Sequence, residues 1–152
     1  AALATLRVPM MDKDLRVSLI RWLETMHMTP GQEFRISDMT VEHILPRRPP
    51  EGSHWITDFP EPDERFLACH ALGNLAALDK VRNERVSNNS FADKKAIYET
   101  AVEEFVTLRD VVGVAAWSSA AIQELTERIA GEVMRQLDLP PPFAGTAQRA
   151  AR

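Results

Sequence analysis

The chain has 152 residues, which is the length of one domain that can bury a core of ordinary size. Its hydrophobic fraction of 45%, charged fraction of 26% and net charge of −4 are typical of a globular protein and argue against nucleic-acid binding over the whole surface. No apolar run approaches the roughly 18 residues of a membrane helix. Cys69 is the single cysteine, which excludes an internal disulfide and a multi-cysteine zinc site, so we expect a cytoplasmic protein.

The first predicted element is a helix over residues 12–26. Asp12 or Asp14 can cap its first turn, and apolar residues recur at helical spacing from Leu15 to Met26. The sequence TPGQ, which contains a proline and a glycine, is expected to end this helix.

A short strand is predicted near residues 41–45, where β-branched and apolar residues precede a proline. Residues 46–65 then contain five prolines. Because proline lacks an amide donor and fixes its own backbone, this segment predicts a long irregular loop. Loops of about 20 residues inside a compact domain are unusual and often functional. We expect Trp55 to pin the loop to the core.

A second short strand is predicted over Leu75–Leu78. The preceding sequence FLACHAL indicates a helix or a turn, in which Cys69 and His70 are expected to pack in or near the core. Gly73 separates that segment from the strand. The two predicted strands form one small β-hairpin.

Helices are predicted for the rest of the chain. One starts near Lys80, and another starts at Ser90 with a capping box and an apolar stripe that runs to Leu108. The last helix covers residues 117–137. The predicted fold class is therefore α+β and mainly helical. We expect residues 1–138 to form one domain and the tail to be disordered, and the start without methionine indicates a C-terminal fragment of a larger protein.

Polar residues gather around the predicted hairpin. Glu42 and His43 end its first strand, Asn74 precedes its second strand, and Asn83 lies nine residues after Asn74 in the next helix. This order resembles the HNH nucleases, which are built on the ββα-metal motif. The resemblance implies an HNH core at about residues 38–100, surrounded by additional helices.

The string NLAALDKVRN matches the HNH pattern except at two positions. Asp79 and Arg82 stand where many HNH sequences carry zinc-binding cysteines, and Asn83 stands at the last ligand position. The resemblance therefore implies an HNH core without a structural zinc.

A closer resemblance covers residues 38 to 130. EHILP, a tryptophan in the loop, LGNLAAL and SNNSFADKKAIY together resemble the C-terminal HNH domain of GmrSD-type restriction endonucleases. Arg47 stands where that family often has glutamine, and Ala76-Ala77 where it often has Thr-Leu. The resemblance implies phage defence by DNA cleavage, with an N-terminal nucleotide-hydrolysing sensor domain as partner in the same protein. A phosphorothioate-sensing subgroup of the family has this nuclease end, but no residue here singles it out.

The resemblance and the chemistry of the side chains imply a role for each residue. A histidine with a pKa near 6.5 can take a proton at neutral pH, so His43 is assigned as the general base. Carboxylate and amide oxygens suit Mg²⁺ or Mn²⁺, so Glu42 and Asn83 are assigned as ligands, with Asn88 as an alternative ligand. Asn74 is expected to orient His43. The alternative for Glu42 is an ion pair with one of the two arginines that follow it.

Neighbouring strand residues point to opposite faces, so the strand must end or twist at Glu42-His43 for both to serve one site. Contacts with the DNA backbone are assigned to basic residues of the two middle helices, for which the alternative is an ordinary solvated face: Arg82, Arg85, Lys94 and Lys95. The sequence therefore predicts a metal-dependent endonuclease that nicks or cleaves DNA with little sequence preference. The alternative is a degenerate, non-catalytic HNH module that binds DNA or a partner domain.

Overall fold

The structure, a computed structural model, describes residues 7–27 and 38–137. The predicted TPGQ turn and the tail lie outside these residues. The elements in chain order are α2 (Lys13–Met26), β1 (Met39–His43), α3 (His54–Asp58), α4 (Pro62–Cys69), the 3₁₀ turn η2 (Leu72–Asn74), β2 (Leu75–Asp79), α5 (Lys80–Val86), α6 (Phe91–Glu99), α7 (Thr107–Val112) and α8 (Ser119–Gln136). The predicted mainly helical α+β class is confirmed. No helix in the described ranges is both long and apolar enough to cross a membrane.

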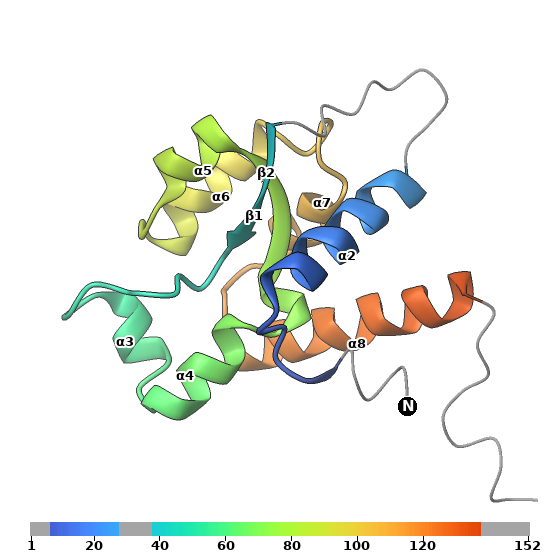
Figure 1. Ribbon diagram of the computed structural model, residues 1–152. Coiled ribbons are helices and arrows are strands. Elements are labelled where there is room, and N and C mark those ends of the chain that lie inside the picture. The colour runs from blue at the N-terminus through green and yellow to red at the C-terminus, as the bar shows by residue number, and fades with distance from the viewer. Residues whose placement is uncertain (1–6, 28–37, 138–152) are drawn as a thin grey trace, which may run out of the picture.

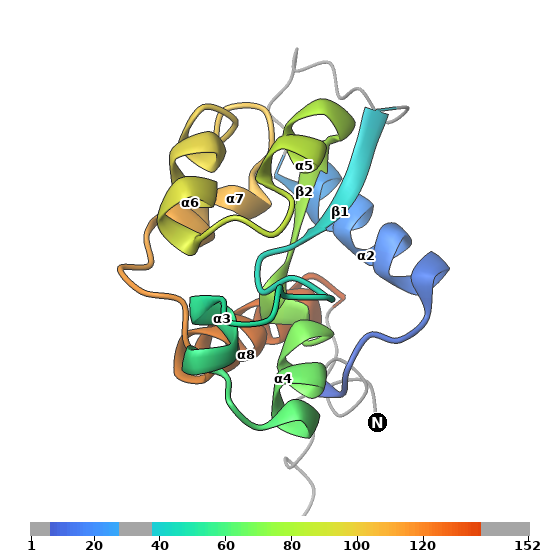
Figure 2. The same ribbon diagram turned by 90° about the vertical axis from the view of Figure 1, so that its left-hand side faces the viewer.

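The β-hairpin forms the centre of the fold. β1 and β2 pair antiparallel, with Glu42 opposite Ala76 and His43 opposite Leu75. Figures 1 and 2 show α2 on one side of the hairpin and α5 and α6 on the other. Because helices cover both sides, β2 is buried from Leu75 to Leu78 and reads as a continuous apolar run. β1, β2 and α5 form a ββα unit, with α3, α4 and η2 inserted between the two strands.

The helix α2 is anchored by its ends. Asp12 caps it by accepting a hydrogen bond from the Leu15 amide at 2.7 Å, as the sequence predicts. Near its other end Glu24 is buried and accepts hydrogen bonds from the Val106 and Thr107 amides and from the Thr107 hydroxyl. Leu15, predicted to be in the apolar stripe, is 47% exposed, so the buried face is narrower than expected.

The prediction of an irregular loop over residues 46–65 is only partly right, because two short helices lie in or start within it. Pro62 occupies the first turn of α4, where its missing amide removes no helical hydrogen bond. Trp55 lies in α3, is 1% exposed, and donates from its indole nitrogen to the Asn89 carbonyl. The prediction that Trp55 pins this segment to the core is confirmed.

The helix that starts at Ser90 is shorter than predicted. The Ser90 hydroxyl caps α6 as expected, but the helix ends at Glu99 rather than continuing to Leu108. α7 begins as a new helix at Thr107, where the carboxylate of Glu24 accepts the first free amides. A tertiary contact with α2 therefore divides an apolar stripe that looks continuous in the sequence.

The turn η2 rests directly on the backbone of α8. The Gly73 amide donates to the Thr126 hydroxyl at 2.9 Å, and a Cβ on Gly73 would lie 2.2 Å from the Ile122 carbonyl oxygen. Only glycine permits this approach. The last helix, predicted over residues 117–137, is observed as α8 with Ser118 as its cap.

Candidate active site

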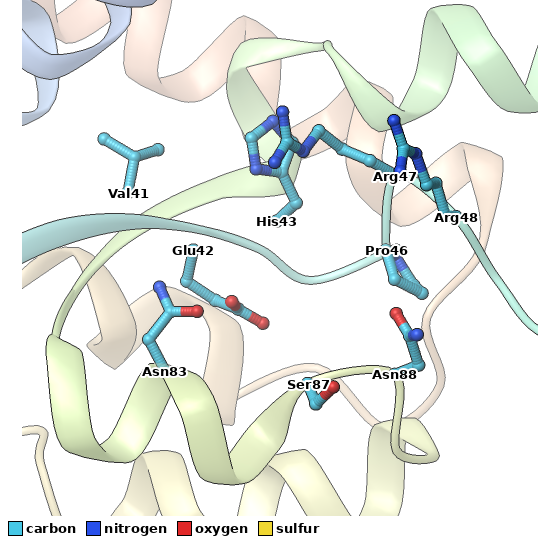
Figure 3. A pocket seen from close by; sticks show the side chains of 9 residues that line it. All are labelled: Val41, Glu42, His43, Pro46, Arg47, Arg48, Asn83, Ser87 and Asn88. Atoms are coloured by element: carbon cyan, nitrogen blue, oxygen red, sulfur yellow. The ribbon is translucent and has the colours of Figure 1, made fainter.

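A cavity of about 400 Å³ opens where β1 ends beside α5 and the turn that follows α5 (Figure 3). Its lining is mostly polar and comes from two stretches of the chain: Val41, Glu42, His43, Pro46, Arg47, Arg48, Asn83, Ser87 and Asn88. The cavity therefore brings together four of the side chains to which the sequence assigns chemistry.

Glu42 is the buried acid of this cavity. It is 4% exposed, and its Oε1 accepts hydrogen bonds from Lys94 Nζ and from the Tyr98 hydroxyl, each at 2.7 Å. Burial raises the pKa of Glu42 and lowers the pKa of Lys94, against the attraction between the two. Within the described residues Glu42 makes no ion pair with Arg47 or Arg48, which was the alternative expected from the sequence.

Lys94 is not exposed at the surface, as a contact with DNA would require. Its side chain is fully buried, and its ammonium also donates to the His43 carbonyl at 3.1 Å. Lys94 and Tyr98 lie four residues apart, so both lie on the face of α6 that packs on the core. The assignment of Lys94 to DNA is therefore corrected: it holds Glu42 and the end of β1.

Tyr98 is a site residue that the sequence reasoning missed. The signal was the i, i+4 spacing of Lys94 and Tyr98 within SFADKKAIY, which places both beside one acid. Burial, and then the charge of Glu42, raise the pKa of Tyr98 well above its ordinary value. Tyr98 therefore stays protonated and acts as a donor to Glu42.

His43 is the last residue of β1. Figure 3 shows its ring and the Glu42 carboxylate on opposite sides of the strand, so the expected alternation holds, and both residues line the cavity at the end of the strand. Burial, and then the positive charges of Arg47 and Arg16, lower the pKa of His43 to about 3. The imidazole is therefore neutral at pH 7.

Asn83 and Asn88 face the cavity from α5 and from the turn after it. The Asn83 amide nitrogen donates to the Thr40 hydroxyl at 2.7 Å, which directs its oxygen to the side of Glu42 (Figure 3). Asn88 is exposed in the turn that begins at Ser87, a residue with φ 38°. The next residue of this turn, Asn89, accepts the hydrogen bond from Trp55, so α3 fixes the turn.

Asn74 lies behind the cavity and is completely buried. Its Oδ1 accepts from the Leu45 amide and the Trp117 indole nitrogen, and its Nδ2 donates to the carbonyls of Leu45 and Cys69. These four hydrogen bonds join the chain that leaves β1 to the end of α4 and to the segment before α8. They use both polar atoms of the side chain and leave neither for a metal.

The side chains of the other proposed DNA contacts differ in exposure and in the hydrogen bonds that they already make within the protein. Arg82 donates to Asp79 at 2.8 Å and to Glu104 at 2.7 Å, and Lys95 donates to the Val114 carbonyl. Arg85 is exposed. Arg47 and Arg48, which the sequence suggested only as partners of Glu42, are exposed and line the cavity.

The cavity fits a hard divalent cation. Lys94 and Tyr98 occupy one carboxylate oxygen of Glu42, and its second oxygen accepts no hydrogen bond among the described residues. The Asn83 oxygen lies on the same side of the cavity, with Asn88 across from it. Carboxylate and amide oxygens are the donors that Mg²⁺ and Mn²⁺ prefer.

Comparison with known proteins identifies the family of the chain. Residues 11–132 match the family model for the C-terminal domain of GmrSD restriction endonucleases. The match does not distinguish the phosphorothioate-sensing subgroup. No curated protein and no solved structure matches the chain.

Proposed function

Since the chain belongs to the family of GmrSD restriction endonucleases, C-terminal domain, we propose that it is a metal-dependent HNH endonuclease that nicks or cleaves DNA. The observation that carries the proposal is the single cavity that receives Glu42, His43 and Asn83. An acid, an imidazole and an amide oxygen at one cavity are what phosphodiester hydrolysis needs: ligands for a cation and an acceptor for the proton of water.

His43 is the general base of this proposal. Its imidazole is neutral, so a ring nitrogen can accept a proton from the attacking water. A group with a pKa of about 3 is a weak base, but an anionic phosphate beside the ring favours the imidazolium form and raises that pKa. Bound DNA therefore brings the base closer to the operating pH.

Glu42 and Asn83 would hold the cation, with Asn88 within the same cavity. A bound Mg²⁺ or Mn²⁺ supplies charge neutralisation on the phosphate and on the leaving oxygen. Lys94 and Tyr98 fix the Glu42 carboxylate, and Lys94 also holds the His43 carbonyl. Asn74 is a positioning residue, because it fixes Leu45, two residues after His43.

DNA would be held by its phosphates. Arg47 and Arg48 are exposed cations at the cavity, and Arg85 is an exposed cation on α5. Phosphate contacts position the duplex and carry no sequence information, so little sequence preference is expected. Target choice then belongs to a sensor domain of the larger protein. Strong cleavage by this chain alone that depends on DNA modification would contradict that division of labour.

A second candidate function is a degenerate HNH module that binds DNA or a partner domain without cleaving. The observation that favours it is the ion pair between Lys94 and Glu42, because the lysine already neutralises the proposed metal ligand. The two candidates differ in whether a divalent cation at Glu42 and Asn83 produces cleavage.

The test uses supercoiled plasmid with Mg²⁺ or Mn²⁺ and an EDTA control. Asn83→Ala removes a proposed ligand, and Asn89→Ala is the matched control, because its side chain bonds only the Arg85 carbonyl within the described residues. We expect nicking by the unmodified chain and by Asn89→Ala, and loss of nicking in EDTA and in Asn83→Ala. Cleavage that survives EDTA and Asn83→Ala contradicts the metal-dependent mechanism.

A further inference from the structure

A second group of side chains converges on the side of His43 away from Glu42. His43, Cys69 and His70 each offer one ligand atom, and the three atoms lie within 4.8 Å of one another. Asn74 brings them together, because its Nδ2 bonds both the Cys69 carbonyl and the chain just after His43. The ring planes of His43 and His70 meet edge to face at 86° with centroids 5.5 Å apart.

Two nitrogens of this cluster have no partner among residues 7–27 and 38–137. His43 Nε2 and His70 Nδ1 are both buried and make no hydrogen bond within these ranges, and the His70 residue is only 8% exposed. Buried polar atoms are nearly always satisfied, so each exception calls for a reason. The two histidines that carry these atoms form the cluster with Cys69, the chain's only cysteine, and a metal ion bound by all three side chains would explain both exceptions.

We propose that His43, Cys69 and His70 form a second metal site that takes a borderline transition ion, Zn²⁺ foremost, and that its occupation switches the nuclease off. The site is distinct from the oxygen-lined cavity of Glu42 and Asn83. Its inhibitory effect rests on the proposed function, whereas its metal binding does not.

The donor set selects the ion. Two imidazole nitrogens and a thiolate are ligands of zinc sites that keep one coordination position open, and Mg²⁺ instead prefers oxygen. Zinc bonds of about 2.0–2.3 Å place tetrahedral ligands roughly 3.5 Å apart, so the three atoms need to draw together by about 1 Å. Side-chain rotation of Cys69 and His70 can supply that movement.

An ion can reach the cluster without passing the nuclease cavity. A separate cavity of about 270 Å³ lies against α4, and Cys69 and His70 are in its wall. Its other lining residues are Pro46, Arg47, Pro49, Ile56, Pro62, Arg65 and Phe66. The fourth coordination position would face this cavity and take water or an anion.

The charges around the cluster of His43, Cys69 and His70 affect its affinity for a metal ion. Arg47 and Arg16 act on the cluster and oppose a dication, while Glu42 acts in the opposite sense on Cys69. Burial raises the pKa of the Cys69 thiol to about 11, so metal binding must release its proton. The thiolate that forms offsets one positive charge of the ion.

Coordination at His43 Nε2 explains the inhibition. A neutral imidazole that binds a metal through one nitrogen carries its proton on the other nitrogen. Neither nitrogen then has a free lone pair, and His43 cannot accept a proton from water. Mg²⁺ at one site would therefore support cleavage, and Zn²⁺ at the other would stop it.

The test is a titration of the folded chain with Co²⁺, a spectroscopic substitute for zinc. A thiolate-to-cobalt charge-transfer band can arise only from Cys69, the single cysteine. We expect this band in the unmodified chain, its loss in Cys69→Ser, and at least tenfold weaker binding in His70→Gln. His54→Gln, a change at an exposed histidine outside the cluster, is the matched control and keeps the band. Circular dichroism verifies that each variant is folded.

No band, or equal cobalt affinity in all four proteins, overturns the site. The inhibitory effect is measured separately, by adding Zn²⁺ to plasmid nicking in excess Mg²⁺. Inhibition of the unmodified chain and resistance of Cys69→Ser support the switch, and equal inhibition of both overturns it. A chain without nuclease activity would contradict the proposed function while the cobalt band still decides the site.

Discussion

Glu24 and Glu42 are both buried glutamates, 1% and 4% exposed, yet their surroundings differ in kind. Glu24 accepts three hydrogen bonds from the neutral donors of Val106 and Thr107, and both of its oxygens are used. Glu42 accepts two hydrogen bonds at one oxygen, one of them from a buried lysine, and borders a cavity.

The difference separates scaffold from site. The Thr107 hydroxyl donates to Glu24 and accepts from the Ala77 amide, so the Glu24 network ties α2 and α7 to β2. A carboxylate satisfied by backbone amides in this way stabilises the fold. A carboxylate that keeps an oxygen beside a polar cavity, with its pKa raised by burial, is a candidate for chemistry.

The largest effect is expected when Glu42 is replaced by alanine. The change leaves Lys94 buried without its partner, which costs about 3–5 kcal/mol of unfolding free energy, and it removes a proposed metal ligand. Urea unfolding measures the stability and plasmid nicking the activity. The double variant Glu42→Met/Lys94→Met separates the two, because an apolar pair restores stability but not cleavage. Cleavage by the double variant would remove Glu42 from the mechanism.

Gly73 links the scaffold to the site through its neighbour Asn74. Gly73→Ala places a Cβ against the α8 backbone and is expected to cost up to about 3 kcal/mol. Gly131→Ala is the matched control: it lies within α8 with nothing within 4 Å of the added carbon, and should stabilise the protein by about 1 kcal/mol. Thermal unfolding of both variants measures the difference in stability. If both substitutions stabilise the protein, or both destabilise it, the close approach of Gly73 to α8 is contradicted.

Glu24→Gln tests the scaffold side of the comparison. An amide cannot accept from all three donors at Val106 and Thr107, so we expect a loss of about 2 kcal/mol of unfolding free energy. The rate of DNA cleavage per folded molecule should stay unchanged. A variant that remains stable but stops cleaving would show that Glu24 serves the active site and not the scaffold.

The pH dependence of stability is the smallest of these effects. In the unfolded chain His43 takes up its proton near pH 6.5, and in the folded chain only near pH 3. The unfolded state therefore binds more protons between these values, and its advantage grows as the pH falls. We expect a loss of about 1–2 kcal/mol between pH 6.5 and 5, measured by urea unfolding. His43→Gln should lack most of this loss, with a part left that comes from His70, whose pKa burial also lowers, and His54→Gln should keep the loss. An unchanged slope in His43→Gln would place the pKa shift elsewhere.

The local parts of the fold were predictable from the sequence. Asp12 and Ser90 were identified as caps because their hydrogen bonds lie within one turn, and the strand near Leu75 because its residues form an apolar run. The separate start of α7 at Thr107 was not predictable, because the amides there donate to Glu24, more than 80 residues earlier in the chain. A tertiary contact overrode a continuous apolar stripe.

The site shows the same limit. Motif spacing predicted that His43 and Asn83 belong to one place, and the cavity contains both. Lys94 was assigned to DNA as one of the basic residues of the middle helices, because its buried partner Glu42 lies 52 residues away in the sequence and could not be identified from it. The cluster at Cys69 and His70 was missed for a similar reason, since its third member is on β1.

Plasmid nicking by a His43→Ala variant tests the central claim most directly, because His43 is the proposed base. His54→Ala serves as the matched control, since it changes an exposed histidine outside the cavity. The account predicts Mg²⁺-dependent nicking by the unmodified chain and by His54→Ala, with a loss of about 10²–10⁴-fold in His43→Ala. Equal nicking by His43→Ala, with the same dependence on Mg²⁺, would contradict the account.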